Sequence, residues 1–200
     1  MKLSIQHLQR AFKNKDENIE DKINRTTNLL VNQIDTLSEL ATEFSSYAKM
    51  PAPSYEKLNV KNSLDQLVEL YSANTDTKIF LECDDHIEIN FDRSYLSRSV
   101  GNIVKNAIQS IPEDKEGKVE ITVAEDNETI TINVKDNGSG ITDEQAEKIF
   151  MPYFSTKISG MGLGLPLVKN MIESGGGKIS FKTMLDIGTE FTITLPKNTT

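Results

Sequence analysis

The longest stretch without a helix breaker lies at the start of the chain. Residues 1–50 contain neither glycine nor proline and are rich in residues that favour helices. From Ile23 onwards, mostly apolar residues recur along two seven-residue tracks that are offset by four positions. One track holds Ile23, Leu30, Leu37 and Phe44, and the other holds Thr27, Ile34, Ala41 and Ala48. This repeat predicts one long helix with a coiled-coil seam.

A shorter helical segment precedes the long one. Its apolar residues are Leu3, Leu8 and Phe12, and the polar run at 14–18 is a natural helix break. We therefore expect a helical hairpin whose seam is too long for the first helix to cover. Such a hairpin is expected to form a homodimer through a helical bundle. The alternative is that the long helix docks as an amphipathic helix on its own domain.

Pro51 and Pro53 end the helical region, because proline lacks the N–H group that a helix interior needs. We expect a domain boundary here, with a partial helical hairpin in residues 1–52 and a second domain in residues 53–200. Periodicity in the second domain predicts helices at 61–72, 92–111 (with Asp92 as N-cap) and 165–174, and strands at 78–83, 88–91, 118–125, 129–135, 178–184 and 189–195.

The composition excludes several classes of function. A net charge of -8 over 200 residues argues against a nucleic-acid partner, because such proteins present a basic face to the phosphate backbone. The single cysteine, Cys83, rules out an intramolecular disulfide and a cysteine-cluster metal site. No apolar run approaches the ~18 residues that cross a bilayer, so we expect no direct membrane contact by this part of the protein.

Two glycine-rich loops and a pair of asparagines predict a nucleotide site. The loops are Asp136–Ile141 and Gly160–Leu165, and Asn102 and Asn106 lie one helical turn apart. Glycines allow positive φ angles and close approach of the backbone to a ligand, and the N–H groups of such turns hold phosphate. Asparagines four residues apart share a helix face, where an amide oxygen can coordinate Mg²⁺.

The position of each loop predicts a separate role. Asp136 ends a predicted strand, so its carboxylate is a fixed acceptor for the exocyclic amino group of adenine, which favours ATP over GTP. The loop Gly160–Leu165 leads directly into a predicted helix, whose N-terminal N–H groups and dipole favour phosphate. Each feature alone is also typical of an ordinary turn or surface residue, so the prediction rests on their order and combination.

This order of motifs resembles the GHKL ATPase superfamily over residues 59–196. The segment Ile149–Lys157 is similar to the phenylalanine-containing box of sensor histidine kinases. The long helix, which ends in Glu43–Pro51, resembles the second helix of their dimerisation hairpin, most closely that of nitrogen-regulation kinases. The resemblance implies an α+β fold: a two-layer α/β sandwich of the Bergerat type, with helices on one mixed sheet, preceded by the hairpin.

The resemblance also implies roles for individual residues. Asn102, Asn106 and Lys157 are the expected catalytic residues, with Asn106 as the Mg²⁺ ligand and Asp136 as the adenine contact. The residues expected to bind ATP are Asn102, Lys105, Asn106, Asp136, Gly138, Gly140, Ile141, Phe154, Thr156, Lys157, Gly160, Met161, Gly162, Leu163, Gly164 and Leu165. Residues 156–160 would form a short lid, from which Lys157 could reach the γ-phosphate.

Two positions refine this interpretation. Superfamily members that hydrolyse ATP carry a glutamate where this chain has Asn102, and asparagine cannot act as a general base, so phosphoryl transfer is favoured over hydrolysis. Gln109 departs from the family, many of whose members carry a cation there. The alternatives to a kinase are an ATP-hydrolysing gate of the chaperone or topoisomerase kind, and a non-catalytic nucleotide-sensing dimerisation module.

The resemblance implies an ATP-dependent protein-histidine kinase that phosphorylates a histidine for relay to the receiver domain of a response regulator. In these kinases the acceptor is followed by an acidic residue and then Asn-Pro, and neither His7 nor His86 has this context. The chain is therefore expected to be a C-terminal segment that begins after its acceptor and does not phosphorylate itself. Its expected location is the cytoplasm, and anchoring of a longer parent in the inner membrane is left open.

Overall fold

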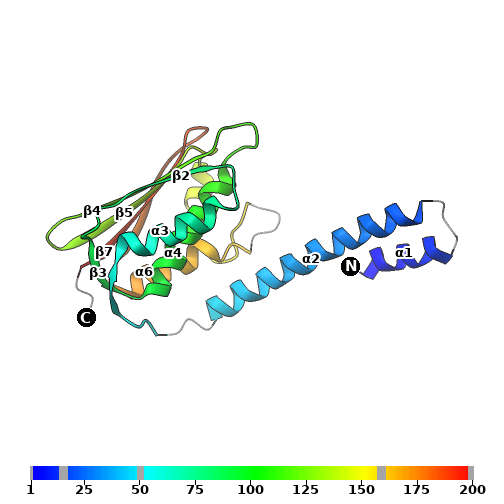
Figure 1. The fold of residues 1–200 in the computed structure, drawn as a ribbon, viewed down its shortest axis with the longest axis horizontal. Helices are drawn as coiled ribbons and strands as arrows, with labels where there is room; N and C mark the ends of the chain where they lie inside the picture. The colour runs from blue at the N-terminus through cyan, green and yellow to red at the C-terminus, as the bar shows by residue number, and fades with distance from the viewer. Residues whose placement is uncertain (1, 14–17, 49–51, 157–160, 198–200) are drawn as a thin grey trace. The chain divides into compact units, whose positions relative to one another are not determined.

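The structure, a computed structural model, describes residues 2–13, 18–48, 52–156 and 161–197. It divides into two units, which we describe separately. The first contains α1 (Lys2–Lys13) and α2 (Ile19–Ala48), as the sequence predicts (Figure 1). Several apolar side chains of α2 are exposed, including Ile34 at 55% and Leu37 at 54%, both on the predicted seam. None of the described helices is long and apolar enough to span a membrane.

The second unit is built on a mixed sheet of five strands, in the order β2-β4-β5-β7-β6. These strands are β2 (Lys78–Glu82), β4 (Lys118–Glu125), β5 (Thr129–Asp136), β6 (Lys178–Met184) and β7 (Gly188–Pro196). Only β2 and β4 pair in parallel; the other neighbours are antiparallel. All five strands lie where their alternating sequences predict them.

A second, two-stranded sheet was not expected. The strand β3 (Glu88–Phe91) pairs with β1 (Glu56–Asn59) rather than with the main sheet, and Leu58 lies opposite Ile89. The main sheet is mixed, as expected, and the β1–β3 pair adds a separate two-stranded antiparallel sheet. Both Leu58 and Ile89 are buried, so this pair contributes side chains to the hydrophobic core.

Three helices cover one face of the sheet: α3 (Val60–Ser72), α4 (Arg93–Ser110) and α6 (Gly164–Ser174) (Figure 1). A short helix, α5 (Asp143–Ala146), lies between β5 and α6 in the sequence. Asp92 caps α4 as expected, and its Oδ1 accepts a hydrogen bond from the N–H of Tyr95 at 2.9 Å. The core lies between the layers and includes Leu64, Leu96, Val100, Ile103, Val119, Ile121, Ile130, Ile132, Val134, Val168 and Ile193. Within this unit, α4 contacts both β5 and α6.

Candidate functional site: a nucleotide-binding region at the end of β5

Asp136 is the buried carboxylate at the end of β5. It is 5% exposed, and its Oδ1 accepts hydrogen bonds from the N–H groups of Gly138 (2.8 Å) and Thr189 (3.1 Å). Burial raises its pKa, although these two N–H groups, the Ser110 hydroxyl and the charge of Lys115 act in the opposite direction. The side chain is therefore held in one orientation by backbone donors on one of its two oxygens.

The loop after Asp136 packs closely against the end of α4 and the end of β6. A Cβ atom on Gly138 would lie 2.0 Å from the Ser110 hydroxyl, and one on Gly140, whose φ is +73°, would lie 2.4 Å from the carbonyl oxygen of Met184. The N–H of Ser139 donates to the carbonyl of Ser110 at 3.0 Å. Both glycines are thus required by close approach, and Gly140 also by its positive φ.

The segment containing Phe154 meets the second glycine loop. The N–H of Tyr153 donates to the carbonyl of Gly162 at 3.2 Å, and a Cβ on Gly162 would lie 2.2 Å from the carbonyl oxygen of Phe154. Gly162 has a φ of +67°, and Tyr153 has an unusual positive φ of 65°. The structure therefore brings together the two motifs that flank the expected lid.

The N-terminus of α6 has donors without a side-chain cap. Leu163, the residue before the helix, makes no capping side-chain hydrogen bond, and Pro166 has no N–H to offer. The N–H groups of Gly164 and Leu165 therefore belong to the first turn, where helices bind anions through orphan donors and the dipole. A Cβ on Gly164 would lie 3.2 Å from the Oδ1 of Asn102, so the second loop and α4 meet at this glycine.

Two of the expected residues of α4, Asn102 and Lys105, lie beside the same cavity. Asn102 is half-buried and donates from Nδ2 to the carbonyl of Arg98 at 2.9 Å. Lys105 and Asn102 line a cavity of about 450 Å³ between α3 and α4. Its other lining residues are Ser63, Gln66, Leu67, Leu70, Tyr71, Ser97, Arg98 and Gly101. Lys105 therefore borders this cavity, and its expected contact with the phosphates stays a prediction.

The remaining expected residues lie on both sides of the lid. Ile141, Phe154, Met161 and Leu165 are half-buried, Leu163 is buried, and Thr156 is exposed. Lys157 and Gly160 lie outside the described residues. Asn106 lies half-buried on α4, one turn after Asn102.

The donor chemistry fits Mg²⁺ held mainly by phosphates. The described residues contain no cluster of three or more His, Cys, Asp or Glu side chains that could hold a metal. Mg²⁺ in nucleotide sites usually takes one or two protein oxygens, with phosphates and water completing its octahedron. A single amide oxygen, as on Asn106, meets that requirement.

Sequence reasoning missed the residues that support Asp136 from other strands. Thr189, at the start of β7, donates its N–H to Asp136, and Ser110, at the end of α4, contacts the glycine loop. Thr183 on β6 accepts a hydrogen bond from the N–H of Ile141 at 2.9 Å. The alternation of the strands gave a signal that could have identified them. Thr183 and Thr189 occupy inward-facing positions of their strands, where the other residues are apolar.

Comparison with known proteins places this arrangement in a family. Residues 91–199, more than half of the chain, match the family described as histidine kinase-, DNA gyrase B- and HSP90-like ATPases. The chain belongs to this family. The match covers α4, both glycine loops and α6, so the expected superfamily is confirmed.

Similar proteins narrow the class within the family. The chain is 31% identical over 185 residues to sporulation kinase B of Bacillus subtilis, covering 90% of this chain and 43% of that protein. It is 30% identical over 185 residues to the nitrogen regulation protein NtrY of Azorhizobium caulinodans, covering 90% of this chain and 24% of that protein. The expected kinship with sensor histidine kinases is confirmed, and the chain spans less than half of these relatives.

Solved structures agree with the fold. The catalytic domain of histidine kinase ThkA superposes with a TM-score of 0.65 at 28% identity, covering 72% of this chain and 96% of that domain. ThkA in complex with the response regulator protein TrrA gives a TM-score of 0.72 at 24% identity, covering 98% of this chain and 57% of ThkA. The expected sandwich of helices on a mixed sheet is therefore confirmed as a histidine-kinase catalytic fold.

Proposed function

We propose that this chain is the ATP-binding catalytic core of a two-component sensor kinase, which transfers the γ-phosphoryl group of ATP to a histidine other than His7 and His86. The observation that carries the proposal is Asp136, a buried carboxylate oriented by two backbone N–H groups. Its second oxygen would accept the exocyclic amino group of adenine, a donor that guanine lacks at the same place.

The phosphates would lie toward the start of α6. The N–H groups of Gly164 and Leu165, at an end without a side-chain cap, would stabilise their negative charge. Asn106 would hold Mg²⁺ through its amide oxygen, and the ion would neutralise charge on the phosphates. Asn102, beside Gly164, would line the site without activating water, because an amide is no general base.

Phosphoryl transfer in trans tests the catalytic part of the proposal. The chain is incubated with Mg-ATP and a longer kinase segment that contains an acceptor histidine and carries an inactivated catalytic domain. We expect phosphohistidine on the longer segment, none on this chain alone, and none with Asn106→Asp. Steady ATP hydrolysis without phosphohistidine would instead support the ATP-hydrolysing gate.

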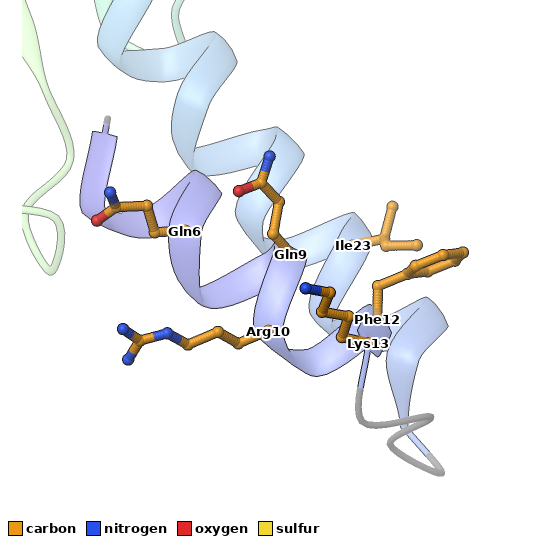
Figure 2. Close-up of a pocket in the computed structure, with 6 residues that line it drawn as sticks. All are labelled: Gln6, Gln9, Arg10, Phe12, Lys13 and Ile23. Carbon is orange, nitrogen blue, oxygen red and sulfur yellow. The ribbon is translucent and has the colours of Figure 1, made fainter.

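We also propose that the hairpin forms a homodimer. Phe12 on α1 is 73% exposed, and with Ile23 of α2 it borders a cavity of about 650 Å³ (Figure 2). Leu29, Val31, Ile34 and Leu37 leave further apolar surface exposed along α2. A second copy of the hairpin would bury this surface in a helical bundle.

Sedimentation of the hairpin variants tests the dimer. Ile34→Glu places a charge on the exposed seam, whereas Asn28→Glu, at an exposed polar position of the same helix, is the matched control. We expect a dimer for the native chain and Asn28→Glu, and a monomer for Ile34→Glu. A native chain that sediments as a monomer at tens of micromolar would contradict the proposal. A response regulator, such as the one that ThkA binds in its complex with TrrA, would then have to bind a monomer.

A further inference from the structure

Two threonine hydroxyls lie on the helix-facing side of the sheet, next to the base-recognition region. Thr183 on β6 is paired in register with Thr189 on β7, and their Oγ1 atoms are 3.0 Å apart. The alternate residues of the same strands, Ile179 on β6 and Phe191 and Ile193 on β7, are buried and apolar. Hydroxyls at such positions need hydrogen-bond partners, and both find them in one another.

Thr183 joins this pair to the loop that follows Asp136. Its Oγ1 accepts a hydrogen bond from the N–H of Ile141 at 2.9 Å and lies 3.3 Å from the carbonyl oxygen of Gly188. Thr189 in turn donates its N–H to the Oδ1 of Asp136. A continuous set of hydrogen bonds therefore runs from the end of the glycine loop, through two strands, back to the carboxylate at its start.

Few other hydrogen bonds among the described residues fix the C-terminal end of this loop, at Gly140 and Ile141. Gly140, just before Ile141, has a φ of +73° and no side chain that could anchor it. The N–H of Asp186 donates to the carbonyl of Ser139 at 2.8 Å, which ties the preceding residue to the same β6–β7 turn. The hydroxyl of Thr183 is the side-chain partner that the structure gives to the N–H of Ile141.

We infer that Thr183 is a positioning residue for adenine recognition: its hydroxyl fixes the loop Gly138–Ile141 against β6 so that Asp136 faces the base. This inference rests on the proposed function, because it concerns how the same site selects its nucleotide. Loss of the hydroxyl would free the Ile141 N–H and loosen the loop, which weakens selection of the base more than binding of the phosphates.

Three substitutions separate positioning from general stability. Thr183→Val keeps the shape and removes the hydroxyl, and Thr183→Ser restores it. Thr192→Val is the matched control, because Thr192 lies on the opposite face of β7 and donates to Asn133 Oδ1 at 2.8 Å. Dissociation constants are measured for Mg-ATP and for Mg-ITP, whose hypoxanthine base has a carbonyl where adenine has its amino group. Melting temperatures are measured without nucleotide.

We expect the native chain to bind ATP more tightly than ITP. Thr183→Val is expected to lower the preference for ATP over ITP by about 5- to 10-fold, the loss of one hydrogen bond at the site. Thr183→Ser and Thr192→Val should keep the native preference. An unchanged preference in Thr183→Val, with ATP still bound, would overturn the inference and leave the proposed function intact.

Two further outcomes are also decisive. A native chain that binds neither nucleotide would overturn the proposed function itself, and the inference with it. If Thr183→Val shows no cooperative melting transition, Thr183→Ala takes its place. Failure of both variants to fold, while Thr183→Ser folds, would contradict the inference, because the hydroxyl would then serve the fold rather than the site.

Discussion

Replacing Asp136 with asparagine should abolish adenine selection while keeping the local fold. Oδ1 accepts both backbone hydrogen bonds, from Gly138 and Thr189, so an asparagine would keep its carbonyl oxygen there. Its amide NH₂ would then replace the second oxygen and face the exocyclic amino group of adenine. Two donors would meet where a donor and an acceptor met before.

The expected loss of affinity follows from this exchange. A hydrogen bond to a charged group contributes about 1.5–3 kcal/mol, and an unsatisfied donor adds to the loss. We expect ATP to bind about 30- to 150-fold more weakly to Asp136→Asn, which corresponds to about 2–3 kcal/mol. Asp65→Asn, an exposed change of the same charge on α3, should leave the affinity unchanged.

Although Asp136→Asn should bind ATP more weakly, its free energy of unfolding relative to the native chain should increase as the pH rises. Burial raises the pKa of Asp136 above its ordinary value of 3.8, so the folded state binds the proton more tightly than the unfolded chain. The contribution of Asp136 to stability is therefore full below pH 3.8 and is lost as the pH rises through the raised pKa. Asparagine does not titrate, so the stability of Asp136→Asn relative to the native chain should rise over this range.

Calorimetric titration with Mg-ATP, and urea unfolding at pH 4 and pH 7, measure these two effects. The reasoning would be refuted by native ATP affinity in Asp136→Asn, because the carboxylate could then not be the adenine contact. A relative stability that falls between pH 4 and pH 7 would show that the buried carboxylate is favoured in its charged form, against the direction that burial imposes.

The remaining predictions concern other parts of the core. Gly162→Ala should lower the free energy of unfolding by about 1–3 kcal/mol, because a Cβ would lie 2.2 Å from the Phe154 carbonyl at a φ of +67°. Gly176→Ala, with a φ of +73° but 3.7 Å to its nearest neighbour, should cost less in the same urea unfolding experiment. Mg-ATP should raise the melting temperature of the native chain, and Asn106→Asp should remove that increase by adding negative charge beside the phosphates. Asp92→Ala should lower the free energy of unfolding by about 0.5–2 kcal/mol through loss of the α4 cap, checked by urea unfolding at neutral pH. Burial alone would raise the pKa of Asp92, but the hydrogen bonds that it accepts from Ser54, Ser94 and Tyr95 together lower it. The contribution of Asp92 to stability should therefore be lost as the pH falls through that lowered pKa. An equal loss of unfolding free energy in Asp92→Ala at pH 7 and at acid pH would contradict this.

Most of the core could be predicted because its signals are local. The strands β4 and β5 alternate cleanly, and Asp92 marks the start of α4 in the sequence as it does in the structure. The four-residue strand β1 gave no such signal, because it forms only where β3 offers a partner far along the chain. For the same reason, the sequence did not predict that β3 would pair with β1 instead of joining the main sheet.

The site divides in the same way. The position of Asp136 at a strand end and the turns at Gly140 and Gly162 could be predicted, because a strand end and a glycine at a positive φ give local signals in the sequence. The supports from Thr183 and Thr189 depend on strand pairing, which periodicity does not give. Lys105 borders the cavity between α3 and α4, and its contact with the phosphates stays a prediction.

The structure of the chain with Mg²⁺ and a non-hydrolysable ATP analogue tests the central claim most directly. We expect the exocyclic amino group of adenine within hydrogen-bond distance of Asp136, and the phosphates beside the N–H groups of Gly164 and Leu165. A nucleotide bound elsewhere, for example in the cavity between α3 and α4, with Asp136 out of contact with the base, would contradict the account.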